Sequence, residues 1–170
     1  MSVKLGDYKK VDGFLRVNNV DSILYGSLGV SAYLGNFRDF DDIDLLVDDE
    51  FIGEKWSFLK ELMSSNGFEI SDEKEHEFVN PEGVKVAFAE KSVLIDDNIC
   101  DPKSDVVKII IDGVEVNTLS PNSFIKAYTF SSTDGYRIEK RGDSDLNIVR
   151  DLKKLKEFEN RPSRRALLNF

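Results

Sequence analysis

The chain has 170 residues, of which 32 are acidic and 23 are basic, so its formal net charge at neutral pH is −9. Hydrophobic residues make up 41% and charged residues 32%. This balance is typical of a globular domain and excludes collagen-like, disordered and membrane-spanning classes. The acidic charge also disfavours binding of duplex DNA by bulk electrostatics, but it leaves open a nucleotide held at a local site.

Cysteine and histidine are too rare to build a disulfide framework or a zinc site of the usual kind. Cys100 is the single cysteine and His76 is the single histidine. The first residues lack the apolar stretch of a signal peptide, and no apolar run reaches the length of a membrane span. We therefore expect a cytoplasmic protein without a membrane contact, in which any metal is a hard cation held by carboxylates.

Helix and strand patterns alternate through the first half of the chain. Tyr8, Val11 and Leu15 recur every three or four residues, which predicts a helix. In chain order the patterns predict a helix over 5–18, a strand over 22–25, a helix over 28–35, a strand over 42–47 and an amphipathic helix over 51–65.

The second half begins with short β patterns and ends in helices. Asp112-Gly113 is a strong hairpin signal, and Ser120-Pro121 is typical of a helix start. We expect strands at 68–71, 75–80, 84–88, 106–111 and 114–119, a helix over 120–130, a loop over 131–142 and a last helix from Asp143 or Ser144. This order predicts an α+β fold with a mixed sheet, as one domain over 1–158 with a basic tail at 159–170.

The most specific chemistry lies between the first two predicted strands. Asp42 and Asp44 are two apart on a strand, so both carboxylates face the same way. At roughly 6 Å they repel by about 3 kcal/mol at an effective dielectric near 20, and a divalent cation would reverse that effect. Gly26 and Ser27 stand where a strand meets a helix, so the glycine allows a phosphate to approach and the helix start can donate hydrogen bonds to it.

This segment resembles the signature of the nucleotidyltransferase superfamily, which includes DNA polymerase beta and the antibiotic nucleotidyltransferases. The signature is an apolar residue followed by Gly-Gly or Gly-Ser, a spacer, and then alternating acidic and apolar residues, and residues 23–47 match it. The later part, residues 113–120 followed by a helix, is similar to the ending of small bacterial members. The resemblance implies a nucleotidyltransferase-like fold with flanking helices.

The same resemblance implies transfer of a nucleoside monophosphate from a nucleoside triphosphate to an acceptor. Asp42 and Asp44 would hold Mg²⁺ or Mn²⁺, and two such ions serve the reaction in the family. Gly26 and Ser27 would hold the β- and γ-phosphates. The acceptor is not identified by the sequence.

Two basic residues are further candidates for nucleotide binding. Arg38 precedes the acids, as a basic residue often does in the family. Lys126 lies on the predicted helix at 120–130, where it can neutralise a triphosphate or be an ordinary solvated lysine.

The third carboxylate of the family is missing from its usual place. Ala87 fills that position on the predicted strand at 84–88. Glu90 is the substitute that we predict to be catalytic, although it is out of phase with Ala87 unless a bulge intervenes. Glu115, Asp96 and Asp97 are other acids in the region.

Two classes of function therefore stay open. The first is an active, metal-dependent nucleotidyltransferase with an unknown hydroxyl acceptor. The second is a catalytically degenerate domain that binds a nucleotide or a protein partner. Small bacterial members of the family often serve in toxin–antitoxin pairs, so the second class includes that role.

Overall fold

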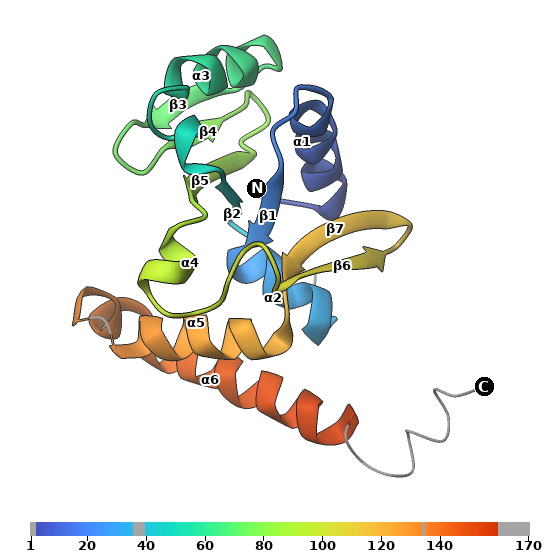
Figure 1. Ribbon diagram of the computed structural model, residues 1–170, viewed down its shortest axis with the longest axis vertical. Helices are drawn as coiled ribbons and strands as arrows, with labels where there is room; N and C mark the ends of the chain where they lie inside the picture. Colours follow the sequence, from blue (N-terminus) through green and yellow to red (C-terminus); the bar gives the residue numbers. More distant parts are fainter. Residues whose placement is uncertain (1–2, 36–39, 134, 160–170) are drawn as a thin grey trace. The chain divides into compact units, whose positions relative to one another are not determined.

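Strand pairing around the central strand β2 organises the first part of the protein (Figure 1). The computed structural model describes residues 3–35, 40–133 and 135–159, and the side chains of 135–143, 158 and 159 fall outside that description. Within the described residues, seven strands form one mixed sheet in the order β3-β4-β5-β2-β1-β7-β6. The strands are β1 (Ser22–Tyr25), β2 (Asp42–Val47), β3 (Glu69–Asp72), β4 (Glu77–Val79), β5 (Lys85–Glu90), β6 (Val106–Ile111) and β7 (Val114–Leu119).

Both parallel and antiparallel pairs occur in this sheet. Strand β2 runs antiparallel to β1 and parallel to β5, while β1 runs parallel to β7. The hairpin of β6 and β7 turns at Asp112 and Gly113, and both residues have positive φ, as the Asp-Gly pair predicts. The prediction of an α+β fold with a mixed sheet is confirmed.

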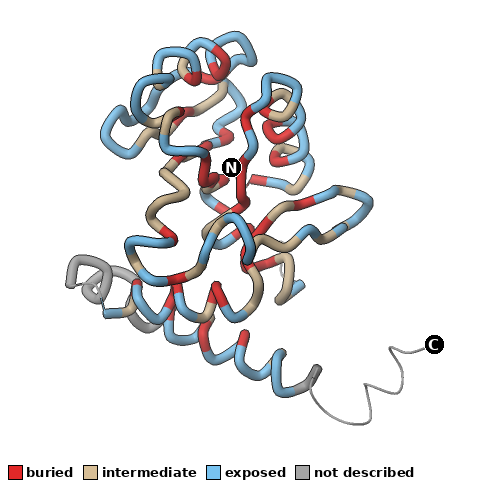
Figure 2. Tube along the Cα trace, viewed as in Figure 1, coloured by how far each residue is buried: buried red, intermediate tan, exposed pale blue. Residues whose placement is uncertain are grey.

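Two helices cover one face of the sheet, and that face carries the hydrophobic core. Helix α1 (Leu5–Val17) contributes Tyr8 and Leu15, and helix α3 (Trp56–Ser65) contributes Leu59 and Met63. All four are fully buried, and Figure 2 shows buried residues along both helices. Their partners from the sheet are the apolar residues of alternating positions on β1, β2, β4 and β5, namely Leu24, Ile43, Leu45, Val47, Phe78, Val86 and Phe88.

Helix α2 (Gly26–Leu34) connects β1 to the segment before β2 and packs against both strands. It starts at Gly26, directly after β1, rather than at residue 28 as predicted. Two short helices, η1 (Asp49–Phe51) and α4 (Val93–Asp96), lie in the connections after β2 and β5. The predicted strands and helices of this part are otherwise present with ends shifted by a few residues.

The chain divides into two compact units, Met1–Leu119 and Ser120–Phe170. The second contains α5 (Pro121–Thr133) and α6 (Gly135–Glu159), which pack on one another. In their contact Ser131 Oγ donates to the buried Asp145 Oδ2 at 3.0 Å. Whether residues 1–158 behave as a single domain stays a prediction. Of the predicted tail at 159–170, residue 159 ends α6, and residues 160–170 lie outside the described residues.

The predicted loop over 131–142 is wrong. Helix α5 continues to Thr133, and α6 already begins at Gly135. The segment is polar, which suggested a loop, but Arg137, Glu139 and Lys140 are good helix formers. A polar stretch can therefore be helical when another part of the same helix, here around Val149 and Leu152, supplies the buried contacts.

None of the helices among the described residues combines the length and the apolar composition that a bilayer crossing requires.

Candidate functional site

Strand β2 presents Asp42 and Asp44 on the face of the sheet opposite the core. Ile43 and Leu45 between and after them are 0% and 1% exposed, whereas both aspartates are half-buried. This alternation is the period of two expected for a strand with one buried face. The two carboxylates therefore share one face, as the spacing predicts.

Gly26 lies directly beneath the carboxylate of Asp44. Tyr25 pairs with Asp44 across the antiparallel strands, and the chain then turns into α2 with Gly26 at φ +62°. A Cβ atom at position 26 would lie 2.0 Å from Asp44 Oδ2 and 2.8 Å from its Cγ. Two reasons therefore favour glycine at position 26. Its backbone is left-handed, and a side chain would collide with the carboxylate of Asp44.

The first turn of α2 is consequently held beside the aspartates. Gly26 and Ser27 are its first two residues, and Ser27 is exposed. The N–H groups of a first helical turn have no acceptor within the helix, and they carry the positive end of the helix dipole. Backbone donors and carboxylates therefore stand side by side, which suits a ligand that has both phosphates and a cation.

Two hydrogen bonds connect β1 and α2 to strand β7 and so stabilise the position of Gly26. Thr118 Oγ1 on β7 donates to Leu24 O on β1 at 2.7 Å. Tyr33 Oη, near the end of α2, donates to Leu119 O at 2.8 Å. Strand β7 thus fixes both the strand that leads to Gly26 and the helix that follows it.

The neighbouring strand β5 places Lys85 beside Asp42 and Ala87 beside Asp44. Ala87, which the sequence resemblance placed at the third acid, therefore lies beside Asp44 in the sheet. The register is regular over its six pairs and brings Glu90 opposite Val47, which belongs to the core face. Without a bulge, the structure does not bring Glu90 to the face of Asp42 and Asp44.

Sequence reasoning missed Glu77 on β4, which pairs with Ala87 and therefore shares its face. Glu77 Oε1 lies 3.0 Å from Lys85 Nζ and accepts a hydrogen bond from Ser71 Oγ at 2.7 Å. The hydrogen bond and the charge of Glu77 raise the pKa of Lys85, with smaller contributions from Asp42 and Asp41. The alternation of Lys85 and Ala87 could have indicated a shared face, but only the strand pairing reveals Glu77.

No group of three or more His, Cys, Asp or Glu side chains with the arrangement of a metal site occurs among the residues that the structure describes.

Two further residues that the sequence suggested for nucleotide binding, Arg38 and Lys126, stay predictions. Arg38 lies outside the described residues. Lys126 is an exposed residue of α5, in the second unit.

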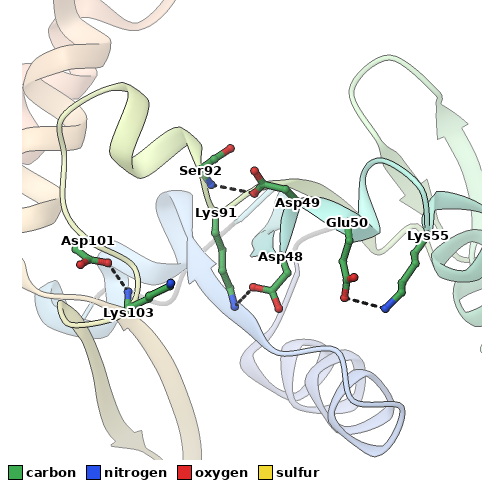
Figure 3. A network of polar contacts seen from close by, with 8 residues as sticks. All are labelled: Asp48, Asp49, Glu50, Lys55, Lys91, Ser92, Asp101 and Lys103. Atoms are coloured by element: carbon green, nitrogen blue, oxygen red, sulfur yellow. Dashed lines mark hydrogen bonds and ion pairs between the residues drawn. The ribbon is translucent and has the colours of Figure 1, made fainter.

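The acidic stretch after β2 has structural partners (Figure 3). Asp48 Oδ1 lies 3.0 Å from Lys91 Nζ, and Asp49 Oδ1 accepts the Ser92 backbone N–H at 3.1 Å. Glu50 forms an ion pair with Lys55 at 2.9 Å. These acids fix the turn between β2 and α3 and the start of the segment after β5.

Comparison of the sequence with known proteins identifies a relative of the chain. No family model matches the chain. The uncharacterized protein YnaI of Bacillus subtilis is 34% identical over 138 residues, which are 78% of this chain and 84% of YnaI.

Solved structures show the fold. An antigenic nucleotidyltransferase-like protein from Paracoccidioides brasiliensis is similar at a TM-score of 0.62 and 16% identity, over 91% of this chain and 79% of that protein. ANT(2″)-Ia in complex with adenylyl-2″-tobramycin is similar at a TM-score of 0.58 and 15% identity, over 88% of this chain and 90% of that protein. The chain therefore belongs to the same family as YnaI, and its fold is that of the nucleotidyltransferases.

Proposed function

We propose that the protein is a metal-dependent nucleotidyltransferase that moves a nucleoside monophosphate from a nucleoside triphosphate to a hydroxyl acceptor. The contact between Gly26 and Asp44 carries this proposal, because a Cβ at position 26 would lie 2.0 Å from the carboxylate oxygen. The fold leaves that space only for a backbone without a side chain. Backbone donors of α2 and the acids of β2 are thereby adjacent, as the binding of a metal–triphosphate requires.

The residues present suit Mg²⁺ or Mn²⁺. Asp42 and Asp44 offer half-buried carboxylates on one strand face, and such oxygen ligands are preferred by hard divalent cations that also keep water and phosphate ligands. A bound cation would neutralise the phosphate charge and polarise the phosphoryl group. Asp42 and Asp44 would hold it.

The start of α2 would orient the triphosphate. The backbone N–H groups of Gly26 and Ser27 and the Ser27 hydroxyl can donate to phosphate oxygens at this position. The positive end of the helix dipole favours the same charge. Arg38 and Lys126 are proposed as further contacts to the nucleotide, on the strength of the family resemblance alone.

The acceptor is proposed only as a hydroxyl compound. ANT(2″)-Ia, which shares the fold, was solved with adenylyl-2″-tobramycin. At 15% identity the similarity shows a shared fold but gives no information on the acceptor, so no aminoglycoside is assigned to this chain.

A second candidate is a catalytically inactive domain that binds a nucleotide or a protein partner, including a partner in a toxin–antitoxin pair. The register favours it through one observation, the pairing of Ala87 with Asp44. A methyl group there can neither bind a cation nor accept a proton. Glu77 is one strand further away, in a bond to Lys85.

Calorimetric titration with ATP, GTP, CTP and UTP, with and without Mg²⁺ or Mn²⁺, tests the proposal. We expect metal-dependent binding that disappears when Asp42→Asn and Asp44→Asn are combined, while circular dichroism shows an unchanged fold. Binding to none of the four nucleotides by the folded protein, or equal binding by the double variant, would contradict the proposed site.

Transfer assays on the same samples separate the two candidates. A labelled nucleotide transferred to a hydroxyl compound by the wild type, and not by the double variant, supports the enzyme. If the wild type binds nucleotide without transfer and Ala87→Asp creates metal-dependent transfer, the inactive domain is the correct alternative.

A further inference from the structure

Charges of both signs lie on the site face of the sheet, next to the proposed cation ligands. Asp42 and Lys85 form one cross-strand pair, and Asp44 and Ala87 form the next. Beyond Ala87, Glu77 holds the ammonium group of Lys85 at 3.0 Å. Lys85 is thus the residue in register with Asp42, and its side chain, 47% exposed, carries a positive charge that is paired with Glu77 on β4.

Contacts with neighbouring residues restrict the side chain of Lys85. Glu77 is anchored in turn by the Ser71 hydroxyl at 2.7 Å, and its side chain is only 19% exposed. A lysine whose ammonium group is held by a partly buried carboxylate has fewer orientations than a free surface lysine. Its charge acts on Asp42, whose carboxylate in turn helps to raise the pKa of Lys85.

A positive charge beside two carboxylates has opposite effects on the two components of a metal–triphosphate. It repels a divalent cation that arrives alone, because the two positive charges are close on a half-exposed surface. It attracts the polyanionic phosphate chain, whose charge exceeds that of the cation. The same residue therefore opposes the cation alone and favours the cation together with phosphate.

We propose that Lys85, oriented by Glu77, makes cation binding at Asp42 and Asp44 dependent on the triphosphate. Lys85 is a positioning residue in this account and is not required to contact the reacting atoms. The proposal rests on the proposed function, since it assumes that Asp42 and Asp44 hold the cation. It predicts that the cation and the triphosphate each bind more tightly when the other is present. This cooperativity would depend on the side chain of Lys85.

Two titrations with inorganic probes test it without reference to base, acceptor or activity. Mn²⁺ binding alone is followed by electron paramagnetic resonance of the free ion, and inorganic triphosphate binding at saturating Mn²⁺ is followed by calorimetry. We expect Lys85→Met to tighten Mn²⁺ alone by roughly threefold to tenfold and to weaken triphosphate by a similar factor. Lys85→Arg keeps the charge and is expected to behave as the wild type in both titrations.

The second variant, Glu77→Gln, shifts the balance in the other direction. It removes a negative charge and releases Lys85, so Mn²⁺ alone is expected to bind about twofold to fivefold more weakly. A purely structural role of the ion pair would move both variants, and both probes, in the same direction. Opposite signs are the signature of an electrostatic role.

Lys108→Met is the matched control. Lys108 is a lysine of the same sheet that pairs with a glutamate, Glu115, at 3.2 Å, but it lies on β6, three strands away from β2. Screening leaves little of a surface charge at that separation, so both titrations should stay at wild-type values.

The outcomes separate this proposal from the one on which it rests. If combined Asp42→Asn and Asp44→Asn abolish Mn²⁺ binding but Lys85→Met changes neither titration, or weakens both, the role of Lys85 is overturned and the cation site stands. If the wild type binds no Mn²⁺ with or without triphosphate, or the double aspartate variant binds it equally well, both proposals are overturned.

Discussion

Two groups of charged residues on opposite faces of the same sheet are built in different ways. On the site face, Asp42 and Asp44 are half-buried, and the residue in register with Asp42 is Lys85, whose ammonium group lies 3.0 Å from Glu77. On the core side, Asp12 of α1 is 7% exposed, and its Oδ2 accepts a hydrogen bond from Arg16 Nε, one helical turn further on, at 2.7 Å.

The group between α1 and the sheet is mostly buried, although the Arg16 side chain is 36% exposed, and its hydrogen bonds are incomplete. Besides Asp12 and Arg16 it contains Tyr8 and Ser22, which are 0% and 3% exposed. Among the described residues, the Tyr8 hydroxyl, Asp12 Oδ1, Arg16 Nη2 and Ser22 Oγ are buried without a well-formed hydrogen bond. Such atoms lower stability, whereas half-exposed carboxylates keep part of their hydration.

The comparison suggests that charged residues on the two faces serve different purposes, namely ligand binding on the site face and stability on the core face. Charges on the site face can exchange water for a ligand, so their replacement should change binding more than stability. Asp12 of α1 is buried and paired with Arg16 at 2.7 Å, so replacing either residue should change stability more than binding. The three predictions below test this division.

The largest expected effect is on ligand binding, from Gly26→Ala. Its Cβ would displace the Asp44 carboxylate and force φ +62° on an alanine. We expect loss of metal-dependent nucleotide binding by more than about a hundredfold, with destabilisation of about 1–3 kcal/mol. Calorimetry and urea unfolding measure the two effects.

Gly35→Ala is the control for the backbone alone. Gly35 ends the same helix at φ +69°, and among the described residues no atom outside the adjoining backbone lies within 4 Å of the place that a Cβ would take there. It should lose about 1 kcal/mol of stability and keep the wild-type affinity. Equal binding losses in the two variants would show that helix α2, rather than the contact with Asp44, is responsible.

The next effect is on stability, from Arg16→Met. This change leaves the carboxylate of Asp12 buried without its cation, and we expect a loss of about 2–3 kcal/mol in the free energy of unfolding. Burial already raises the pKa of Asp12 despite the opposing effect of Arg16. Its raised pKa means that protonation favours the folded state, so the loss should shrink as the pH falls toward the ordinary value of 3.8.

Adding Asp12→Asn to Arg16→Met should restore part of the lost stability, because the unpaired charge is then gone. Nucleotide affinity should stay at the wild-type value in both variants. A binding loss comparable to that of Gly26→Ala would contradict the separation of the two faces.

The smallest effect is expected from Tyr8→Phe. The Tyr8 hydroxyl approaches Arg16 and the backbone of Asn117 without a well-formed hydrogen bond, so its removal should change stability at neutral pH by less than about 1 kcal/mol. Burial and the charge of Asp12 raise the pKa of Tyr8 far above 10.0. Urea unfolding at neutral and alkaline pH measures both.

The sign of the alkaline effect follows from the raised pKa. Above pH 10.0 the tyrosine of the unfolded chain ionises while Tyr8 in the folded protein keeps its proton, so unfolding is favoured. Tyr8→Phe should reduce this alkaline loss of stability. An unchanged pH profile would show that Tyr8 is not the group that titrates on unfolding.

Local patterns predicted most of the fold and the aspartate pair. Asp42 and Asp44 alternate with residues that need burial, and Gly26-Ser27 is typical of a turn from strand to helix, so both follow from neighbouring residues alone. The hairpin at Asp112 and Gly113 follows from the positive φ values that only a few residues tolerate.

What failed or was missed depends on contacts between distant segments. The polar residues 131–142 looked like a loop because the helix that contains most of them is stabilised further along, at Val149 and Leu152. The position of Glu90 depends on the register of β5 against β2, and Glu77 enters the site face only through its pairing with Ala87. Pairing between strands is not written in the sequence of either strand.

The close approach of Gly26 and Asp44 has an evolutionary consequence. While an aspartate occupies position 44, any side chain at position 26 is penalised, but a relative with a smaller residue at 44 is freed from much of that penalty. Among relatives of this chain, a substituted glycine at 26 should therefore accompany a lost acid at 44. The residues at these two positions would therefore identify, from sequence alone, the members of the family in which the proposed site is lost.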